Sequence, residues 1–398
     1  RDVEQGAITT TDTSAFVVGR NLATTPGKVV FQNELFQLLQ YVPLSDKVFE
    51  RPLLIVPPCI NKYYILDLQP HNSFVRHAVE QGNTVFVVSW RNPGPEQGRL
   101  GWDDYIEDGV LTAISTARDI AKTEQINALG FCVGGTLLTT ALAVAAARGE
   151  QPVRSLTLLT TILDYSEPGD LGCFIDEAMI AAKERTIGKN GVFPGREMAG
   201  VFSALRANDM IWQYVVNSYL KGEPPTAFDL LYWNADSTNL PGPFLVWYLR
   251  HLYQENALRI PGALQACGAG VDLGRVDVPV FVLATREDHI VPWRSAFRSA
   301  KLLGGEVTFA LGASGHVAGV INPARANKRG YWTGAPIGDD AETWLAAASE
   351  YPGSWWTAWS QWLVAHAGKE IAARKRLGNA RYQPIEDAPG TYVLEKGQ

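Results

Sequence analysis

The stretch 126–147 constrains the fold of this chain more than any other segment. It runs for 22 residues without a charged side chain, but glycines interrupt it at Gly130, Gly134 and Gly135. The length would suit a membrane-spanning helix, whereas the glycines suit a tight turn between two buried elements. We therefore expect no membrane span here, but a buried strand over Ile126–Gly130 that turns into a buried helix over 134–148.

Five further short segments share the composition of this strand. They are apolar, rich in β-branched side chains and separated by helical patterns. Such an alternation predicts a mostly parallel sheet whose two faces are covered by helices. The segments are Leu53–Val56, Thr84–Trp90, Ser155–Thr160, Val278–Ala284 and Glu306–Leu311.

Helical periodicity is clear between the predicted strands and towards the end of the chain. Apolar residues in Asp103–Thr123 recur every three or four positions, which makes one buried face. Two more helices are expected over Ala341–Glu350 and Trp355–Ala367. Tryptophans crowd in these two segments, and we expect them to pack in the core against the sheet.

The alternation of strands and helices stops for about 110 residues after the fourth predicted strand. This interval is helical in pattern, and ten of the 42 residues between Trp212 and Tyr253 are aromatic, over twice the chain average of 10%. We interpret it as a cap inserted over the sheet edge, although a small second domain with its own core and no role in chemistry is an alternative. The expected organisation is a first part of the core over 1–163 with an N-terminal extension, the cap over 164–274, and a second part of the core with C-terminal helices over 275–398.

The turn inside the first stretch carries the chemistry. It reads Gly-Phe-Cys-Val-Gly around Cys132, which predicts a nucleophile elbow with cysteine in place of serine. Side chains at Gly130 or Gly134 would clash with neighbouring backbone, and the N-terminus of the following helix stabilises a thiolate. The N–H of Val133 would face an oxyanion. An inert buried thiol is the alternative for Cys132.

This elbow also specifies the fold and the remaining partners. It predicts an α/β-hydrolase fold, with a mostly parallel central sheet and the inserted helical cap, in which an acid and then a histidine follow later strands. Asp288 follows the fifth predicted strand in chain order, and His316 follows the sixth and last. Glu287 stays an alternative for the acid. His289 is a candidate for a supporting or substrate-contacting role.

A second oxyanion donor is expected from the loop after the strand Leu53–Val56. That loop reads Pro-Pro-Cys-Ile-Asn-Lys from Pro57 to Lys62. Because proline has no N–H, the candidates are the backbone groups of Cys59 and Ile60.

Composition excludes several classes of partner. The chain has 35 Lys and Arg against 41 Asp and Glu, a net charge of −6, and no basic run, so we expect no nucleic-acid partner. Its four cysteines are far apart and have neither metal-ligand spacing nor the density of a disulfide framework. We expect no metal site and a reducing, cytoplasmic location.

Six stretches extend the argument well beyond the elbow. They are PPCINKYYILDL (57–68), VSWRNP (88–93), GFCVGGT (130–136), FDLLYWNADSTNLPGP (228–243), REDHIVPW (286–293) and GASGHVAGVINP (312–323). Together they resemble the class I polyhydroxyalkanoate synthases, the bacterial polyester polymerases. The resemblance is to the C-terminal catalytic domain of that family, and the family's N-terminal domain is expected to be absent.

The resemblance implies roles for particular residues. It implies that Cys132 is the nucleophile, His316 the base and Asp288 the third member of the triad. Trp233 and Tyr248 match aromatic positions that the family links to activity or to the substrate region. The implied substrates are a (3R)-hydroxyacyl-CoA, in class I a short-chain one such as 3-hydroxybutyryl-CoA, and the growing polyester chain.

The same resemblance implies a homodimer through the cap, association with polyester granules and no cofactor besides the CoA thioester. The residues by themselves leave two other interpretations open. An α/β-hydrolase-type thioesterase or esterase would use the same Cys-His-Asp triad. A granule-coating protein would use the aromatic cap as an adhesive surface and need no turnover.

Overall fold

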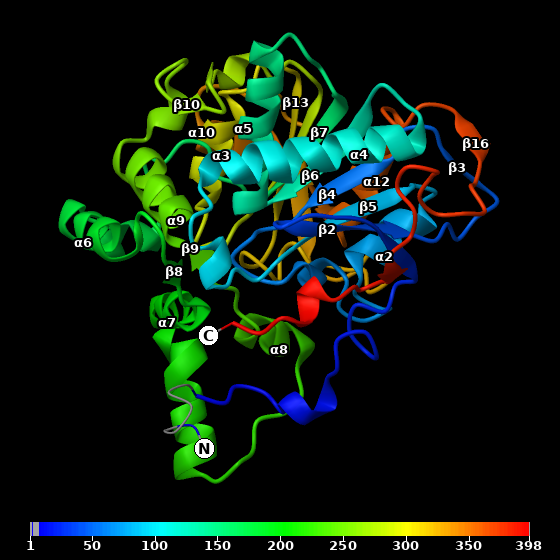
Figure 1. The fold of residues 1–398 in the computed structure, drawn as a ribbon. Helices are drawn as coiled ribbons and strands as arrows, with labels where there is room; N and C mark the ends of the chain where they lie inside the picture. The colour runs from blue at the N-terminus through cyan, green and yellow to red at the C-terminus, as the bar shows by residue number, and fades with distance from the viewer. Residues whose placement is uncertain (1, 3–7, 398) are drawn as a thin grey trace.

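The computed structural model of the chain describes residue 2 and residues 8–397, which are built around one 11-stranded sheet (Figure 1). Six neighbouring strands of this sheet are mutually parallel, as expected for an α/β-hydrolase fold. Each coincides, within one or two residues at either end, with a strand predicted from the sequence. In sheet order they are β13 (Val307–Gly312), β12 (Val280–Thr285), β7 (Val153–Leu159), β6 (Ile126–Phe131), β4 (Leu53–Val56) and β5 (Val85–Trp90).

Antiparallel strands extend both edges of this parallel core, and the sequence analysis does not predict them. Residues 349–350, expected at the end of a helix, instead begin an edge strand, so that prediction is wrong. The backbone becomes extended at Ala348, and the residues that follow pair with the strand Gly330–Thr333. The added strands are β1 (Gly27–Gln32), β2 (Phe36–Tyr41) and β17 (Glu386–Asp387) at one edge, and β14 (Gly330–Thr333) and β15 (Ser349–Pro352) at the other.

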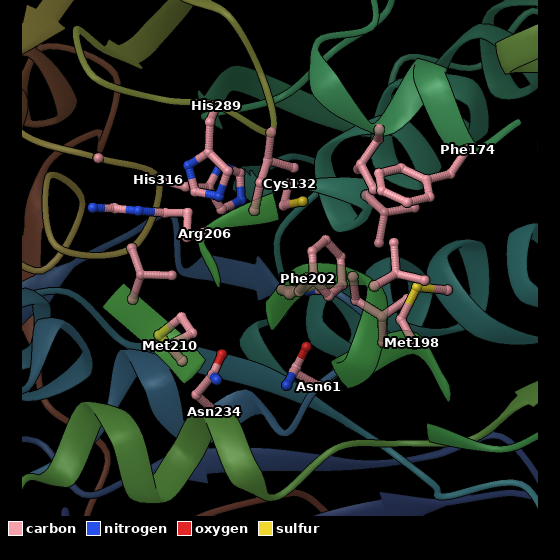
Figure 2. Close-up of a pocket in the computed structure, with 18 of the residues that line it drawn as sticks. Asn61, Cys132, Phe174, Met198, Phe202, Arg206, Met210, Asn234, His289 and His316 are labelled. Carbon is pink, nitrogen blue, oxygen red and sulfur yellow. The ribbon is translucent and has the colours of Figure 1, made fainter. Parts of the chain in front are cut away.

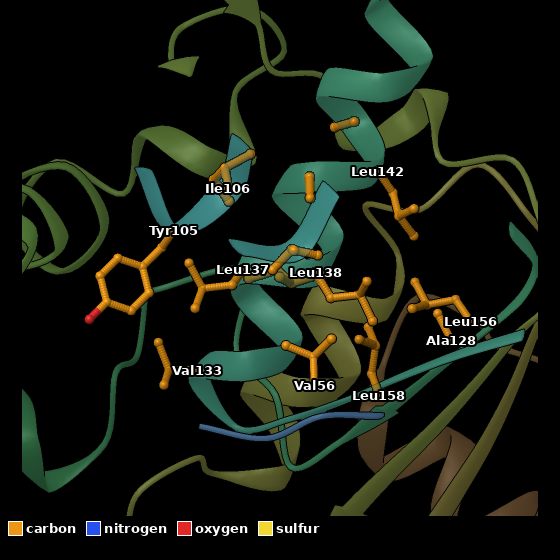
Figure 3. Close-up of a cluster of buried hydrophobic side chains, with 14 of the residues drawn as sticks. Val56, Tyr105, Ile106, Ala128, Val133, Leu137, Leu138, Leu142, Leu156 and Leu158 are labelled. Atoms are coloured by element: carbon orange, nitrogen blue, oxygen red, sulfur yellow. The ribbon is translucent and has the colours of Figure 1, made fainter. Parts of the chain in front are cut away.

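Helices cover both faces of the sheet, because successive strand residues point to opposite sides. In β4, for example, Leu54 and Val56 belong to one apolar cluster, whereas Leu53 and Ile55 belong to the other. Figure 3 shows the first cluster where α5 lies on the sheet. The covering helices are α4 (Thr112–Ala121), α5 (Val133–Ala147) and α10 (Trp293–Ala300) on the first face, and α2 (Phe74–Glu80) and α12 (Trp355–Val364) on the second.

The segment 126–147 forms β6 and α5, so the expected strand and helix are confirmed. The predicted helix over 103–123 is also present, but its first half, Tyr105–Leu111, is π-helical. Among the described residues, no helix combines the length and the apolar character needed to cross a membrane.

The tryptophans of α12 pack in the core, as predicted. Trp355, Trp356 and Trp359 are buried against the sheet. The indole groups of Trp355 and Trp356 donate to the carbonyls of Gly319 (3.0 Å) and Val320 (2.9 Å). These carbonyls lie just after His316, so the helix also anchors the loop that carries the expected base.

The interval between β7 and β12 adds no strand to the main sheet and lies to one side of it in Figure 1. Apolar residues of this cap, including Leu245 and Leu252, join the same cluster as the sheet, which argues against a separate domain with its own core. The boundaries 1–163, 164–274 and 275–398 stay predictions. The main cap helices are α6 (Glu177–Ile187), α7 (Gly195–Leu205), η6 (Asn208–Trp212), η7 (Val215–Leu220), α8 (Asp229–Ala235), α9 (Gly242–Tyr248) and η8 (Leu249–Gln254).

The packing of α12 generates a stability prediction. The indole of Trp359 is fully buried and donates to the hydroxyl of Thr157 at 3.0 Å. Trp359→Ala is expected to lower the free energy of unfolding by about 3–5 kcal/mol, because it leaves a cavity and an unpaired hydroxyl. Chemical denaturation measures this. The matched control is Trp212→Ala, at a side chain that is 58% exposed, and an equal loss in both variants would contradict the prediction.

Candidate active site

The elbow at Cys132 is a sharp turn between β6 and α5. Its backbone has φ 53° and ψ −128°, a conformation that L-residues rarely adopt. Hydrogen bonds from Cys132 N to Leu159 O (2.9 Å) and from Gly135 N to Cys132 O (2.9 Å) hold this conformation. The turn thereby places the thiol at the carboxyl edge of the sheet, beyond the end of the strand.

The glycines of the elbow are required by steric contact, as predicted. A Cβ at Gly130 would lie 2.4 Å from Gly135 Cα, and a Cβ at Gly134 would lie 2.3 Å from Val56 O. Both distances are well below van der Waals contact, and both involve backbone that cannot rotate away. The close approach lets α5 start directly above the ends of β4 and β6.

The structure brings Asp288 and His316 together. His316 Nδ1 lies 2.7 Å from Asp288 Oδ2, and both side chains are buried. The other carboxylate oxygen, Oδ1, accepts from Ile290 N (2.9 Å) and Val291 N (2.8 Å), which fixes the orientation of the carboxylate. Phe131 stacks on the imidazole with ring centroids 5.7 Å apart. The imidazole is thus held on two sides.

Charge decides the protonation of His316. Burial by itself lowers the pKa of the imidazole, but the negative charges of Asp288 and of a Cys132 thiolate outweigh burial and raise that pKa to about 10. Figure 2 shows the His316 ring beside the Cys132 thiol. A protonated His316 beside Cys132 would stabilise the thiolate, the form in which cysteine is a nucleophile.

Cys132 and His316 open into a cavity of about 730 Å³ between the sheet edge and the cap. This volume is within the range of pockets that hold small-molecule ligands. Asp288 lies behind the imidazole and does not line the cavity. Of the other candidates from the sequence, the cavity wall includes Ile60, Val133, Trp233, Tyr248, Glu287 and His289.

The predicted oxyanion donors differ in their surroundings. Val133 is the first residue of α5, so no residue of that helix accepts from its N–H. Ile60 lies on the cavity wall, and its carbonyl accepts from Thr238 N at 3.3 Å. Cys59 is buried outside the cavity wall, and burial raises the pKa of its thiol far above the usual range. The oxyanion roles stay predictions.

His289 lies half-buried on the cavity wall near His316 (Figure 2). Within the described chain its Nδ1 has no hydrogen-bond partner. Burial lowers the pKa of this imidazole below 6.5, more than the nearby Asp288 raises it. Burial thus favours the neutral imidazole, and the substrate-contacting role of His289 stays a prediction.

Two aromatic residues of the cap are also held in place on the wall. The indole of Trp233 donates to Lys62 O at 2.7 Å. The hydroxyl of Tyr248 accepts from Tyr165 at 3.3 Å, and its ring stacks on Trp102 at 5.7 Å between centroids. The structure thus holds both side chains on the cavity wall, and their substrate-contacting roles stay predictions.

Sequence reasoning missed several wall residues. All three methionines of the chain line this cavity, and methionine adapts to ligands of variable shape. Their spacing in the sequence shows no pattern, so only their rarity could have drawn attention to them. The missed residues include Met179, Met198, Met210, Asn61, Asn234 and Arg206. In the described part of the chain, no cluster of three or more His, Cys, Asp or Glu side chains could hold a metal ion.

The sheet, the cysteine elbow and the buried Asp-His pair define this protein as a member of the α/β-hydrolase-fold class with a cysteine at the nucleophile position. The family model of the alpha/beta hydrolase fold matches residues 52–323. A monoacylglycerol lipase structure from Paleococcus ferrophilus is similar over 84% of this chain and 100% of its own, with 15% identity and a TM-score of 0.46.

More specific relatives are polyester polymerases. The poly(3-hydroxyalkanoate) polymerase subunit PhaC of Cupriavidus necator is 56% identical over 99% of this chain and 68% of its own length. The corresponding protein of Rhizobium etli is 46% identical over 97% of this chain and 60% of its own length. The chain belongs to the poly(3-hydroxyalkanoate) polymerase family.

The family's N-terminal region is represented in this chain. The model described as the poly-beta-hydroxybutyrate polymerase (PhaC) N-terminus matches residues 1–78. In the structure this match covers strands β1, β2 and β4, which belong to the main sheet. The chain therefore carries at least part of a region that the sequence analysis expects to be absent.

The buried pair generates a prediction that also separates the two candidate acids. Asp288→Asn is expected to lower the pKa of His316 from about 10, because a carboxylate stabilises the imidazolium and an amide does not. NMR titration of the imidazole measures this. Glu287→Gln is the control, since Glu287 is exposed; an equal shift in that variant would contradict the assignment.

The same pair predicts a pH dependence of stability. The folded pKa of His316, about 10, lies above its unfolded value of about 6.5. Its contribution to stability is therefore fully present below pH 6.5 and is lost as the pH rises towards 10. We expect Asp288→Asn to reduce this slope in denaturation curves measured between pH 6.5 and 10.

Proposed function

We propose that this chain polymerises a (3R)-hydroxyacyl-CoA, specifically a short-chain one such as 3-hydroxybutyryl-CoA, into a polyester and releases CoA. The observation that supports this function best is the cysteine elbow beside the buried His316–Asp288 pair, facing a large cavity in a chain of the polymerase family. Cys132 acts as the acyl carrier, and no cofactor is needed besides the thioester itself.

In the first step, the Cys132 thiolate attacks the thioester carbonyl. The tetrahedral oxyanion accepts from Val133 N–H and from a second donor in the loop 57–62. Its collapse breaks the bond to the CoA sulfur, which takes the proton of the His316 imidazolium, and leaves an acyl-Cys132 thioester. Exchange of one thioester for another is nearly isoenergetic, so the acyl group stays activated.

In the second step, the 3-hydroxyl of another acyl group attacks this thioester. His316, now neutral, takes the hydroxyl proton, and Asp288 holds the imidazole and stabilises the imidazolium. The new ester bond forms as the bond to Cys132 Sγ breaks, so the thiolate and imidazolium are regenerated. Each cycle lengthens the chain by one unit.

The cap supports transfer to a hydroxyl over transfer to water. The side chains that it contributes to the cavity are mostly apolar, including Phe193, Met198, Phe202 and Leu245. Such a wall disfavours water near the acyl-Cys132 thioester. Residual water access would favour the alternative activity, a thioesterase with the same triad.

We also propose that the protein is cytoplasmic, forms a homodimer through the cap and associates with polyester granules. Exposed apolar side chains on the cap support the dimer and the association with granules, because surfaces of this kind are typical of interaction sites. They are Trp212, Val216, Tyr219, Leu220 and Phe228.

The test is CoA release from (3R)-hydroxybutyryl-CoA with parallel collection of insoluble product. The unaltered protein is expected to produce both, and Cys132→Ala neither. Cys132→Ser should lose nearly all elongation, because the oxygen ester it forms is not activated for transfer. Full polymerisation by Cys132→Ser would contradict the thioester step.

The form of the product separates the alternatives. CoA release with free hydroxybutyrate as the sole product would indicate a thioesterase. Binding to polyester that Cys132→Ala leaves unchanged, with no CoA release from the unaltered protein, would indicate a granule-coating protein.

A further inference from the structure

Lys62 is a buried lysine close to the candidate site. The residue is 2% exposed, which is rare for a lysine because burial removes the ammonium from water. It ends the loop 57–62, which forms part of the cavity wall and carries the expected second oxyanion donor. Its ammonium donates to the carbonyl of Glu395 at 2.5 Å. A buried charge at this position calls for an explanation.

The ammonium lies among charged groups of two other segments. Asp236, just after α8 of the cap, attracts it electrostatically. The same carboxylate accepts from Tyr64 at 2.9 Å and pairs with Lys396 at 3.0 Å. Lys62 is thus at the centre of a junction between the loop 57–62, the cap and the last described residues of the chain, which run close to α8 in Figure 1.

The junction also fixes the peptide groups of the loop. Trp233, from α8, donates to Lys62 O at 2.7 Å, and Thr238 N donates to Ile60 O at 3.3 Å. The C=O of one residue and the N–H of the next share a trans peptide plane, so anchoring Ile60 O and Lys62 O sets the directions of the Asn61 and Tyr63 N–H groups. It also restrains the adjacent peptide that carries the Ile60 N–H. An oxyanion donor is effective only when it is aimed in advance at the developing charge.

We propose that Lys62 is a positioning residue for acyl transfer: its ammonium ties the loop 57–62 to Glu395 and, through Asp236, to the end of α8, and so restrains the loop that carries the expected oxyanion donor. This inference rests on the proposed function. It assigns a role to the junction that neither the elbow nor the triad explains.

The charges around Lys62 make the junction sensitive to pH. Burial lowers the pKa of the Lys62 ammonium to about 8; Asp236 and Glu395 oppose this shift, and Lys396 adds to it. Arg91, 3.3 Å from the Glu395 carboxylate, is a further cation at the junction. Lys62 is therefore charged at pH 7 and loses its attraction to Asp236 as the pH rises through 8. This change falls well below the titration of His316 near 10.

The first experiment is Lys62→Met, with CoA release measured from pH 6 to 10. We expect kcat to fall about tenfold or more with KM changed less than twofold, since small misplacements of catalytic groups cost large factors in rate. The fall in kcat near pH 8 in the unaltered protein should disappear in the variant. Lys47→Met is the matched control, because Lys47 is exposed and pairs with Glu370 only at 3.7 Å.

A second variant tests the junction without removing the buried group. Lys396 is 65% exposed, so Lys396→Met is expected to fold. It removes a positive charge near Lys62 and frees Asp236, so the fall in kcat near pH 8 should move to higher pH. If Lys62→Met does not fold, the pH dependence of kcat in Lys396→Met decides the proposal. Absence of the shift to higher pH in that variant overturns the proposal. A folded Lys62→Met variant with unchanged kcat also overturns it.

Hydrogen exchange separates this inference from the proposed function. Amides of residues 59–66 and 233–238 should exchange faster in Lys62→Met than in Lys47→Met, whatever the reaction is. Absence of CoA release from the unaltered protein would refute the proposed function. Unchanged exchange in folded Lys62→Met would refute the positioning role.

Discussion

The close approach of α5 to the ends of β4 and β6 is the contact on which the rest of the site depends. It exists because Gly130 and Gly134 have no Cβ, and a Cβ at Gly134 would lie 2.3 Å from Val56 O. The same turn holds Cys132 at a positive φ of 53° and leaves the first N–H groups of α5 without helical partners. A steric requirement in the backbone therefore determines where the thiol and the expected oxyanion donor lie.

Electrostatics adds a second constraint at the same sheet edge. Asp288 and His316 come from loops after two adjacent parallel strands, β12 and β13, so the sheet itself brings them within 2.7 Å. The carboxylate is held by two backbone N–H groups, and its negative charge favours the protonated form of the buried imidazole. The cap then encloses this charged group in a largely apolar cavity, where its interactions are stronger than in water.

Much of this arrangement could be predicted from residue patterns. The six parallel strands are short apolar segments between turns, and the elbow is a local motif whose glycines have one steric explanation. Cys132, Asp288 and His316 each follow a predicted strand, in the order expected for nucleophile, acid and base. The structure puts the last two in contact. The edge strands β14 and β15 were not predicted. β15 is exposed along its whole length, so it has no apolar face that a pattern could reveal. Residues 349–350 illustrate this, since only pairing with β14 makes them extended.

The sequence alone determined the parallel sheet, the cysteine elbow and the candidate acid and base, because these depend on periodicity and on contacts within a few residues. Only the tertiary structure decided which side chains form the cavity wall and how buried charges are compensated. The three methionines gather there although their spacing has no pattern, and Lys62 meets Glu395 from the far end of the chain. The physical reason is that cavity walls and buried ion contacts join segments distant in sequence, whose proximity no local pattern encodes.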